Sequence, residues 1–408
     1  MSQALELAVD SCVRMSHLFG DPNYLFHFPR KKTSYIGFGC EKRIEIYRNR
    51  LKVFSGDQVE CKDFAGNPVE QLANLIDPEC PAVFLLSQDY IRNFQDDRLP
   101  LFLCLQPKHE VELVYSGRES KKFIHPESVS SSHWDSQSDD QFVKRLHDGI
   151  SLLAQYEGKL IVSRGYQKKA RGDLFKFFEI FAGREPTSAC SHYIKISENI
   201  QSVGCSPENV FELEDRRLVF DVVASTRGIS PDPEKDRRWI EELKSDPKEI
   251  REHMMAFNRY QARMESLVEK NSLSIDQFQD VLEMGMVRHL HSKLSGDLRS
   301  DLNWVSLLKD SFPPLTSYPA ELAERMQDNP EPNRYYGGVV GRVAPNAKTV
   351  GAYLNIRALL SCDETLYTQG GVGVIAESSA EKELLEVKNK LRGLMTAVDI
   401  WQGLNCSG

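Results

Sequence analysis

Short apolar runs separated by turn residues dominate the first third of the chain. Among them are TSYIGFGC (33–40), RIEIYRN (43–49), AVFLLS (82–87), LPLFLCL (99–105) and EVELVYS (110–116). Runs of this length, rich in β-branched and aromatic side chains, predict β-strands. Further strands are expected over 159–164, 189–196, 209–215, 217–223, 336–343, 351–360 and 366–376.

Segments with an apolar residue at every third or fourth position alternate with these strands. This period predicts helices, which are expected over 141–156, 234–270, 280–310 (short helices), 319–327 and 378–395. Strands interspersed with amphipathic helices predict a mixed α/β fold.

No linker of convincing length divides the chain. We therefore expect one domain over residues 1–408, with a variable N-terminal part at 1–140 and the motif-bearing part at 141–400.

The composition of the 408 residues is that of a globular protein, with 41% hydrophobic residues and a formal net charge of −8. The acidic balance, without a long basic run, predicts no nucleic-acid partner. No apolar stretch approaches the roughly 20 residues that a membrane span needs. The N-terminal MSQALELAVDSC lacks the basic start and apolar run of a signal peptide, so we expect a cytoplasmic protein. The nine cysteines form no C-x-x-C pair and indicate neither a zinc site nor a disulfide framework.

The helix expected over 378–395 carries charges beside its apolar stripe. Glu383, Glu386 and Lys390 fall within roughly 60° of one another along one edge of that stripe. Glutamate and lysine at this spacing are common on helix surfaces. The position beside the stripe favours the other interpretation, in which these charges face a cavity.

A second helix start, SDPKEIREHMM (245–255), repeats this arrangement. Asp246 suits the N-cap and Glu249 the capping-box position, whereas Glu252 lies one turn further along the same face. Two helices thus each present two glutamates three residues apart. Four carboxylates converging on one cavity would repel one another unless a cation lay between them, and Mg²⁺ suits such an oxygen-rich site.

Two further residues have both an ordinary and a chemical interpretation. Lys159 opens the apolar run KLIVSR (159–164). It is either a solvated strand end or, if partly buried, a general base. Glu208, after the Ser-Pro turn of GCSPENVFEL (204–213), is either an exposed turn residue or a carboxylic acid held protonated.

Three more segments carry candidate binding groups. His289 and His291 lie in a strand-like stretch, MVRHLHSKLSG (286–296). Arg357 lies within the apolar IRALL, where an unpaired guanidinium would be costly, so it requires an anion such as a ligand carboxylate. The glycines of QGGVGVIAES (369–378) permit a ligand to approach backbone N–H groups.

Taken together and in order, these segments resemble the chorismate-utilising enzymes, namely the anthranilate, aminodeoxychorismate, isochorismate and salicylate synthases. The matching blocks run from about residue 159 to 395 and are KLIVSR, GCSPE, DPKEIREH, VRHLHS, EP…RYYGGVVG, IRALL, GGVGVIAES and EKELLEVKNK. The resemblance implies one large α/β domain, in which two antiparallel β-sheets form a sandwich with helices packed outside.

The resemblance also implies a Mg²⁺ ion that binds the ring carboxylate of chorismate. By position, Glu252 and Glu386 are expected to be direct ligands, and Glu249 and Glu383 to act through water. His289 falls at the active-site histidine. The substrate-binding groups are expected to be Thr226, Tyr336, Arg357, Lys390 and backbone N–H groups near Gly371 and Gly373.

Lys159 indicates which reaction to expect. Ammonia-using members of the family typically have glutamine at this position, and water-using members have lysine. The resemblance therefore implies that Lys159 deprotonates a water for attack at C2, while Glu208 protonates the departing C4 hydroxyl. The expected product is isochorismate, converted further to salicylate and pyruvate in siderophore or secondary-metabolite biosynthesis by a monomer. The alternatives are release of isochorismate, use of ammonia or of a modified chorismate, and a non-catalytic ligand-binding relative.

The chain departs from the family pattern in three places. Ser225 replaces the glycine of the usual Ala-Gly-Thr. LTSYPAEL (315–322) replaces T-x-S-G-x-P-K, with Tyr318 in place of a small residue and no lysine after Pro319. EPNRYYGG is shortened before Tyr336. The first two changes are expected near the pocket and bear on substrate and product.

Overall fold

Helices and strands alternate through the computed structural model, which describes residues 2–63, 69, 74–87, 99–116, 133–284, 287–310, 317–319, 321–322 and 334–405. The helices are α1 (Gln3–Phe19), α3 (Asp139–Leu153), α4 (Leu174–Arg184), α5 (Pro233–Ser245), α6 (Pro247–Leu267), α7 (Trp304–Asp310) and α9 (Ala380–Asn405).

The strands fall into an N-terminal and a C-terminal set. The first nine are β1 (Pro22–Phe28), β2 (Thr33–Ile46), β3 (Arg50–Ser55), β4 (Gln58–Asp63), β5 (Ala82–Leu86), β6 (Phe102–Val114), β7 (Asp135–Ser136), β8 (Leu160–Lys169) and β9 (Cys190–Ser197). The others are β10 (Ile200–Ser206), β11 (Asn209–Glu214), β12 (Arg217–Gly228), β13 (Ser274–Met284), β14 (Val287–Asp297), β15 (Val339–Val343), β16 (Thr349–Leu354), β17 (Ala358–Cys362) and β18 (Thr365–Val374).

All of these strands pair antiparallel, in one continuous order. Starting from β7, the neighbours are β8, β18, β17, β10, β9, β1, β2, β6, β5, β15, β16, β11, β12, β14 and β13. The short strands β3 and β4 extend from the far end of β2. The two halves expected as separate sheets are therefore joined through β1, β2 and β6.

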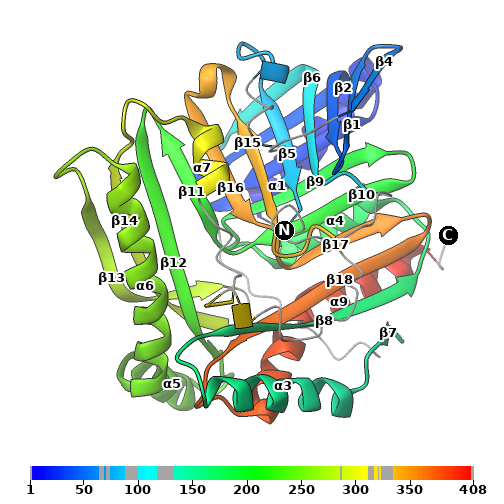
Figure 1. Ribbon diagram of the computed structural model, residues 1–408. Helices are drawn as coiled ribbons and strands as arrows, with labels where there is room; N and C mark the ends of the chain where they lie inside the picture. Colours follow the sequence, from blue (N-terminus) through cyan, green and yellow to red (C-terminus); the bar gives the residue numbers. More distant parts are fainter. Residues whose placement is uncertain are drawn as a thin grey trace.

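Helices cover the outer faces of both halves. In Figure 1, α5 and α6 lie along β12 and β14, while α9 and α3 lie along β18 and β8. The apolar face of α6 packs on Leu218, Phe220 and Leu294, and α9 packs through Val387 and Leu391 on β8 and β18. Burial of these stripes anchors the two helices that carry the paired glutamates.

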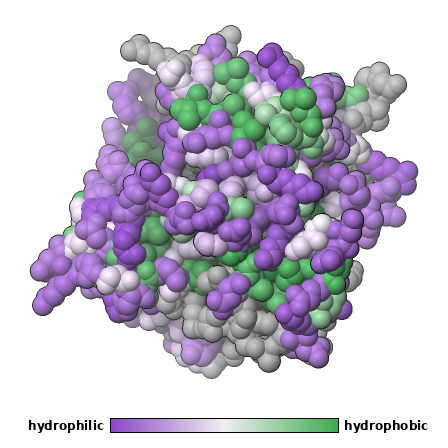
Figure 2. Space-filling view, turned by 90° about the horizontal axis from the view of Figure 1, so that it is seen from above, coloured by the Kyte–Doolittle hydropathy of each residue, from purple (hydrophilic) through white to green (hydrophobic). Residues whose placement is uncertain are grey.

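On the face drawn in Figure 2 the surface is mainly hydrophilic. Figure 2 shows one face on which polar residues predominate and hydrophobic residues occur in small separate groups. Among the described helices, none has the length and apolar character needed to cross a membrane.

The predicted mixed α/β fold with antiparallel strands and outer helices is confirmed, and three of its details are corrected. The region around 280–310 forms β13 and β14 before the short α7, because the apolar positions of β14 are buried against β12. The helical region at 234–270 is two helices, divided at Asp246, which caps the second. The strand expected over 351–360 is interrupted between β16 and β17. The helix expected over 319–327 lies largely outside the described residues.

Candidate active site

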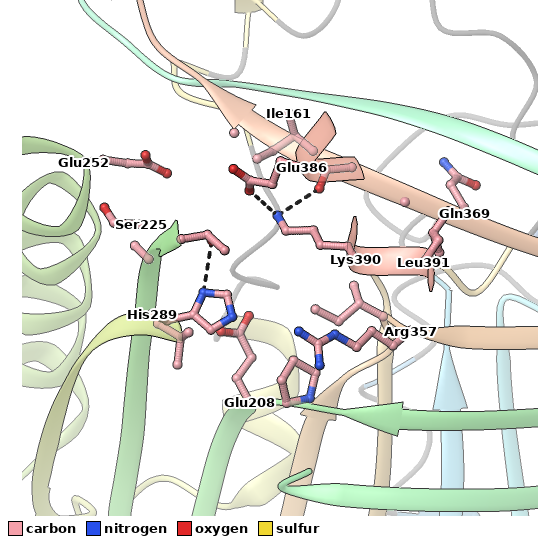
Figure 3. Close-up of a pocket in the computed structure, with 18 of the residues that line it drawn as sticks. Ile161, Glu208, Ser225, Glu252, His289, Arg357, Gln369, Glu386, Lys390 and Leu391 are labelled. Carbon is pink, nitrogen blue, oxygen red and sulfur yellow. Dashed lines mark hydrogen bonds and ion pairs between the residues drawn. The ribbon is translucent and has the colours of Figure 1, made fainter. Parts of the chain in front are cut away.

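A cavity of about 110 Å³ lies between the pair β8–β18 and the pair β12–β14. Its walls come from the start of β8, from β18, β12 and β14, and from α6 and α9. Eleven of the thirteen site residues that the sequence predicts line it: Lys159, Glu208, Thr226, Glu252, His289, Tyr336, Arg357, Gly371, Gly373, Glu386 and Lys390. In Figure 3, Glu252 approaches the cavity from one side, and Glu386 and Lys390 approach it from the other.

Lys159 is fixed through both its backbone and its side chain. Its N–H donates to the carbonyl of Tyr318 at 2.8 Å, and its carbonyl accepts from the Tyr318 N–H at 2.7 Å. The lysine stem lies against Gly373, where an added Cβ would come within 2.1 Å of Lys159 Cε. Nζ is 3.2 Å from Glu252 Oε1. The ammonium is therefore held inside the cavity, which excludes a solvated strand end.

Glu208 is a buried carboxyl group at the base of the cavity. The turn before it is fixed by the Ser206 hydroxyl, whose one proton is shared between the carbonyl oxygens of Leu354 and Glu208, at Oγ–O distances of 2.6 and 3.0 Å. Burial raises the pKa of Glu208 to about 8, with Lys390 opposing and Asp221 adding to the shift. The group is thus protonated near neutral pH and can donate a proton.

His289 is a neutral imidazole beside Glu208. Burial, with the nearby Arg357 and Lys390 cations, lowers its pKa well below 6.5. The Thr226 hydroxyl lies 3.0 Å from Nδ1, and the buried Nε2 has no hydrogen-bond partner among the residues that the structure describes. If the hydroxyl donates, Nε2–H remains to donate to a ligand. His291 instead lies 2.8 Å from Asp221, and it does not line the cavity.

Arg357 lies at the interruption between β16 and β17, in a left-handed conformation with φ of +49°. Its Nη1 is 3.4 Å from Oε2 of the buried Glu185. Burial raises the pKa of Glu185, with Arg357 and Arg184 opposing. The anion that Arg357 was expected to require is thus supplied in part by the protein, and binding of a ligand carboxylate by Arg357 stays a prediction. The side chain still lines the cavity (Figure 3).

The four predicted glutamates, Glu249, Glu252, Glu383 and Glu386, form one group that we call the glutamate cluster. Lysine side chains lie between the four carboxyl groups. Lys390 Nζ is 2.8 Å from Glu386, while Lys248 Nζ is 3.6, 3.7 and 3.8 Å from Glu249, Glu252 and Glu383. Within the described ranges, no three acidic, histidine or cysteine side chains lie together so that they could hold a metal ion.

The pKa values of these carboxyl groups follow from their surroundings. Burial and the neighbouring Glu386 raise the pKa of Glu383 to about 7. Burial also raises the pKa of Glu249, with Lys248 opposing. For Glu252 burial acts in the same direction, but Lys159 and Lys248 outweigh it and the pKa is lowered.

The two departures expected near the pocket differ in their effect. Ser225 lines the cavity at φ of +65°, where glycine is unstrained, and its hydroxyl donates to the Glu249 carbonyl at 2.6 Å. The Tyr318 side chain does not line the cavity, since it is 48% exposed with the Arg259 guanidinium 4.7 Å over its ring. Tyr318 therefore acts on the site through the backbone of Lys159.

Sequence reasoning missed three residues at this site. Lys248 carried a signal, since it lies four residues before Glu252 on one helix. Gln369, which lines the cavity and donates to Ser163 at 2.9 Å, lies next to the glycine run. Glu185 is distant in sequence from every motif, and only the tertiary structure brings it to Arg357.

Comparison with known proteins identifies the family. A family described as chorismate binding enzyme matches residues 21–396, so the chain belongs to that family and the predicted resemblance is confirmed. Anthranilate synthase component 1 from Aquifex aeolicus is 28% identical over 59% of this chain. The match spans 49% of that relative, about half of its length.

Two solved structures share the fold. Anthranilate synthase component I from Streptococcus pneumoniae has a TM-score of 0.72 at 18% identity, over 89% of this chain and 92% of its own. The menaquinone-specific isochorismate synthase MenF from Escherichia coli has a TM-score of 0.64 at 16% identity, over 97% and 100% of the two chains.

Proposed function

We propose that the protein converts chorismate to isochorismate by adding water at C2, and then eliminates pyruvate to give salicylate. The observation that carries the proposal is the presence, in one cavity, of a lysine amine and a buried carboxylic acid that is protonated near neutral pH. Lysine rather than glutamine at position 159 favours water over ammonia.

In the first step one of the two groups accepts a proton and the other donates one. Lys159, in its neutral form, takes a proton from water as the water oxygen bonds to C2. The two conjugated ring double bonds shift, from C1=C2 to C1=C6 and from C5=C6 to C4=C5, as the C4–O bond breaks, and Glu208 gives its proton to the departing hydroxyl, which leaves as water. Isochorismate is an isomer of chorismate, so the atoms balance.

The second step needs restraint more than further acid–base groups. The hydrogen on C2 moves to the enolpyruvyl methylene carbon as the C3–O bond breaks, which yields salicylate and pyruvate. Arg357, Lys390 and the backbone near Gly371 and Gly373 would hold the two substrate carboxylates. Tyr336 and Thr226 complete the walls of this enclosure.

We also propose that the glutamate cluster takes up Mg²⁺, with Glu252 and Glu386 as direct ligands and Glu249 and Glu383 acting through water. The donor set fits, because all four groups offer carboxylate oxygens, which Mg²⁺ prefers. The ion would supply the charge that holds a substrate carboxylate.

Incubation of the purified protein with chorismate tests the proposal. Products are separated by chromatography and pyruvate is followed, with Mg²⁺ or with a chelator, and with or without ammonium. Mg²⁺-dependent salicylate and equimolar pyruvate are expected. If isochorismate is the only product, the protein does not catalyse the elimination step. If anthranilate forms, and only with ammonium, the nucleophile is ammonia and not water. No turnover despite Mg²⁺ binding would favour a modified substrate or a binding role.

A further inference from the structure

We infer that Lys248 is a built-in cation of the glutamate cluster and that it competes with the divalent metal for these carboxylates. The inference rests on the proposed function, from which the metal is taken. It concerns a residue to which neither the motifs nor the proposed reaction assigns a role.

The position of the Lys248 ammonium is the first argument. Nζ is nearly equidistant from carboxylates of two helices, at 3.6 Å from Glu249 and 3.7 Å from Glu252 on α6, and 3.8 Å from Glu383 on α9. These distances exceed those of direct N–H···O hydrogen bonds. The ammonium is thus centred among three anions instead of being bound to one of them, as a metal ion would be.

The other cations near the cluster are engaged differently. Lys159 and Lys390 each lie close to one carboxylate, at 3.2 Å from Glu252 and 2.8 Å from Glu386. Arg227 approaches Glu249 at 3.7 Å but lies closer to Asp246, at 3.1 Å. Of the lysines in the described part of the chain, Lys248 is the one whose ion pairs connect α6 to α9 within the cluster.

The helix itself does not favour a lysine at this position. Lys248 is the second residue of α6, where the positive end of the helix dipole opposes a cation. Its side chain is only 28% exposed. The attraction of the neighbouring carboxylates therefore offsets the unfavourable position of the ammonium.

A divalent ion and this ammonium cannot occupy the same group of carboxylates without strong repulsion. The partial exposure of the lysine gives the ammonium a path to solvent when the metal enters. The measured affinity for the metal is then reduced by the free energy needed to displace the Lys248 ammonium from the same oxygens. In the metal-free protein the ammonium neutralises part of the charge of the cluster.

Calorimetric titration with MgCl₂ tests this inference on wild-type protein and on Lys248→Met, Lys248→Arg and Lys244→Met. Lys248→Met is expected to bind Mg²⁺ about tenfold more tightly than wild type, because the competing charge is gone. Its denaturation midpoint without metal should fall below that of wild type and recover with Mg²⁺. Lys248→Arg keeps the charge and should retain wild-type affinity. Lys244, an exposed residue of α5, provides the matched loss of one charge and should change nothing.

Unchanged or weaker Mg²⁺ binding by Lys248→Met would overturn the inference. If that variant does not fold without metal, the comparison of Lys248→Arg with wild type decides, since altered affinity at constant charge contradicts competition by charge. Chorismate turnover is measured separately. Mg²⁺-dependent turnover without tighter binding by Lys248→Met refutes only the role of Lys248, whereas tighter binding without turnover refutes only the proposed reaction.

Discussion

The sequence around Glu208 suggests an exposed turn, but the surroundings of the side chain keep its carboxyl group protonated. The chain turns inward after Pro207, so the carboxyl group enters the cavity instead of the solvent. Burial favours the uncharged form, which is the form that a general acid requires. The same shift contributes stability below the ordinary pKa of 4.5, and this contribution is lost as pH rises through about 8.

The pH dependence of turnover follows from this shift. Because only protonated Glu208 can protonate the leaving hydroxyl, the rate is expected to fall about tenfold per pH unit above about 8. Initial rates of chorismate loss between about pH 6 and pH 9.5 measure this limb. Glu208→Gln should lower the rate by about 10²–10⁴. The exposed Glu214→Gln is the control, and a rate that still rises above pH 8 would contradict the role of Glu208.

Lys159 is expected to be the base of the first step. Lys159→Met should lower kcat by about 10²–10⁴ while chorismate binding is retained, because the methionine stem fills the same space without an amine. Lys169→Met, at the exposed far end of the same strand, should leave kcat unchanged. Steady-state kinetics and equilibrium binding distinguish the two effects, and equal kcat for the two variants would exclude Lys159 as the base.

At the scale of elements, the close contact of β18 with the start of β8 positions the lysine. Gly373→Ala would place a Cβ 2.1 Å from Lys159 Cε, so the flexible lysine end must move. We expect kcat/KM to fall about 10²-fold with little change in the denaturation midpoint. Gly228→Ala, whose Cβ would meet its nearest atom at 3.7 Å, is the strand control. A large loss of stability in Gly373→Ala would instead indicate a structural role.

The end of α4 supports the interruption between β16 and β17. Glu185→Ala would leave the buried Arg357 guanidinium without its partner and is expected to cost about 3 kcal/mol of unfolding free energy. Denaturant unfolding measures the loss. Glu179→Ala, which breaks an ion pair with the half-exposed Lys176 on the same helix, should cost less than about 1 kcal/mol. Equal losses of unfolding free energy in the two variants would mean that the buried pair stabilises the fold no more than the exposed pair does.

At the scale of the whole molecule, α6 packs on β12 and β14 and α9 on β18, and the ion pairs of Lys248 join the two helices at the glutamate cluster. A metal bound to both should therefore stabilise the folded chain, by about 2.7 kcal/mol at 100 times its Kd. Thermal denaturation with MgCl₂ and with a chelator measures this difference. Glu386→Gln should abolish it, whereas Glu381→Gln, exposed on the same helix, should retain it. Stabilisation of both variants would place the metal elsewhere.

Much of the fold was predictable from local patterns, and most residues that line the cavity were predictable from the resemblance to the chorismate-utilising enzymes. The periodic apolar positions of 378–395 identify the helix, and two of its three edge charges, Glu386 and Lys390, line the cavity. Local patterns failed where a contact distant in sequence decides the structure. Within the region expected to hold short helices, 287–297 forms a strand paired with β12 and β13, as its strand-like pattern indicated, whereas Arg357 has a buried partner because α4 ends beside it.

The sequence by itself determined the family, the mixed α/β class and the residue types that meet at the cavity, because these depend on local periodicity and on motifs kept in order. Only the tertiary structure decided the charge state of Glu208, the partner of Arg357 and the position of Lys248 among the glutamates. Protonation and ion pairing depend on burial and on distances of a few ångströms between groups far apart in the chain. No local pattern contains those distances.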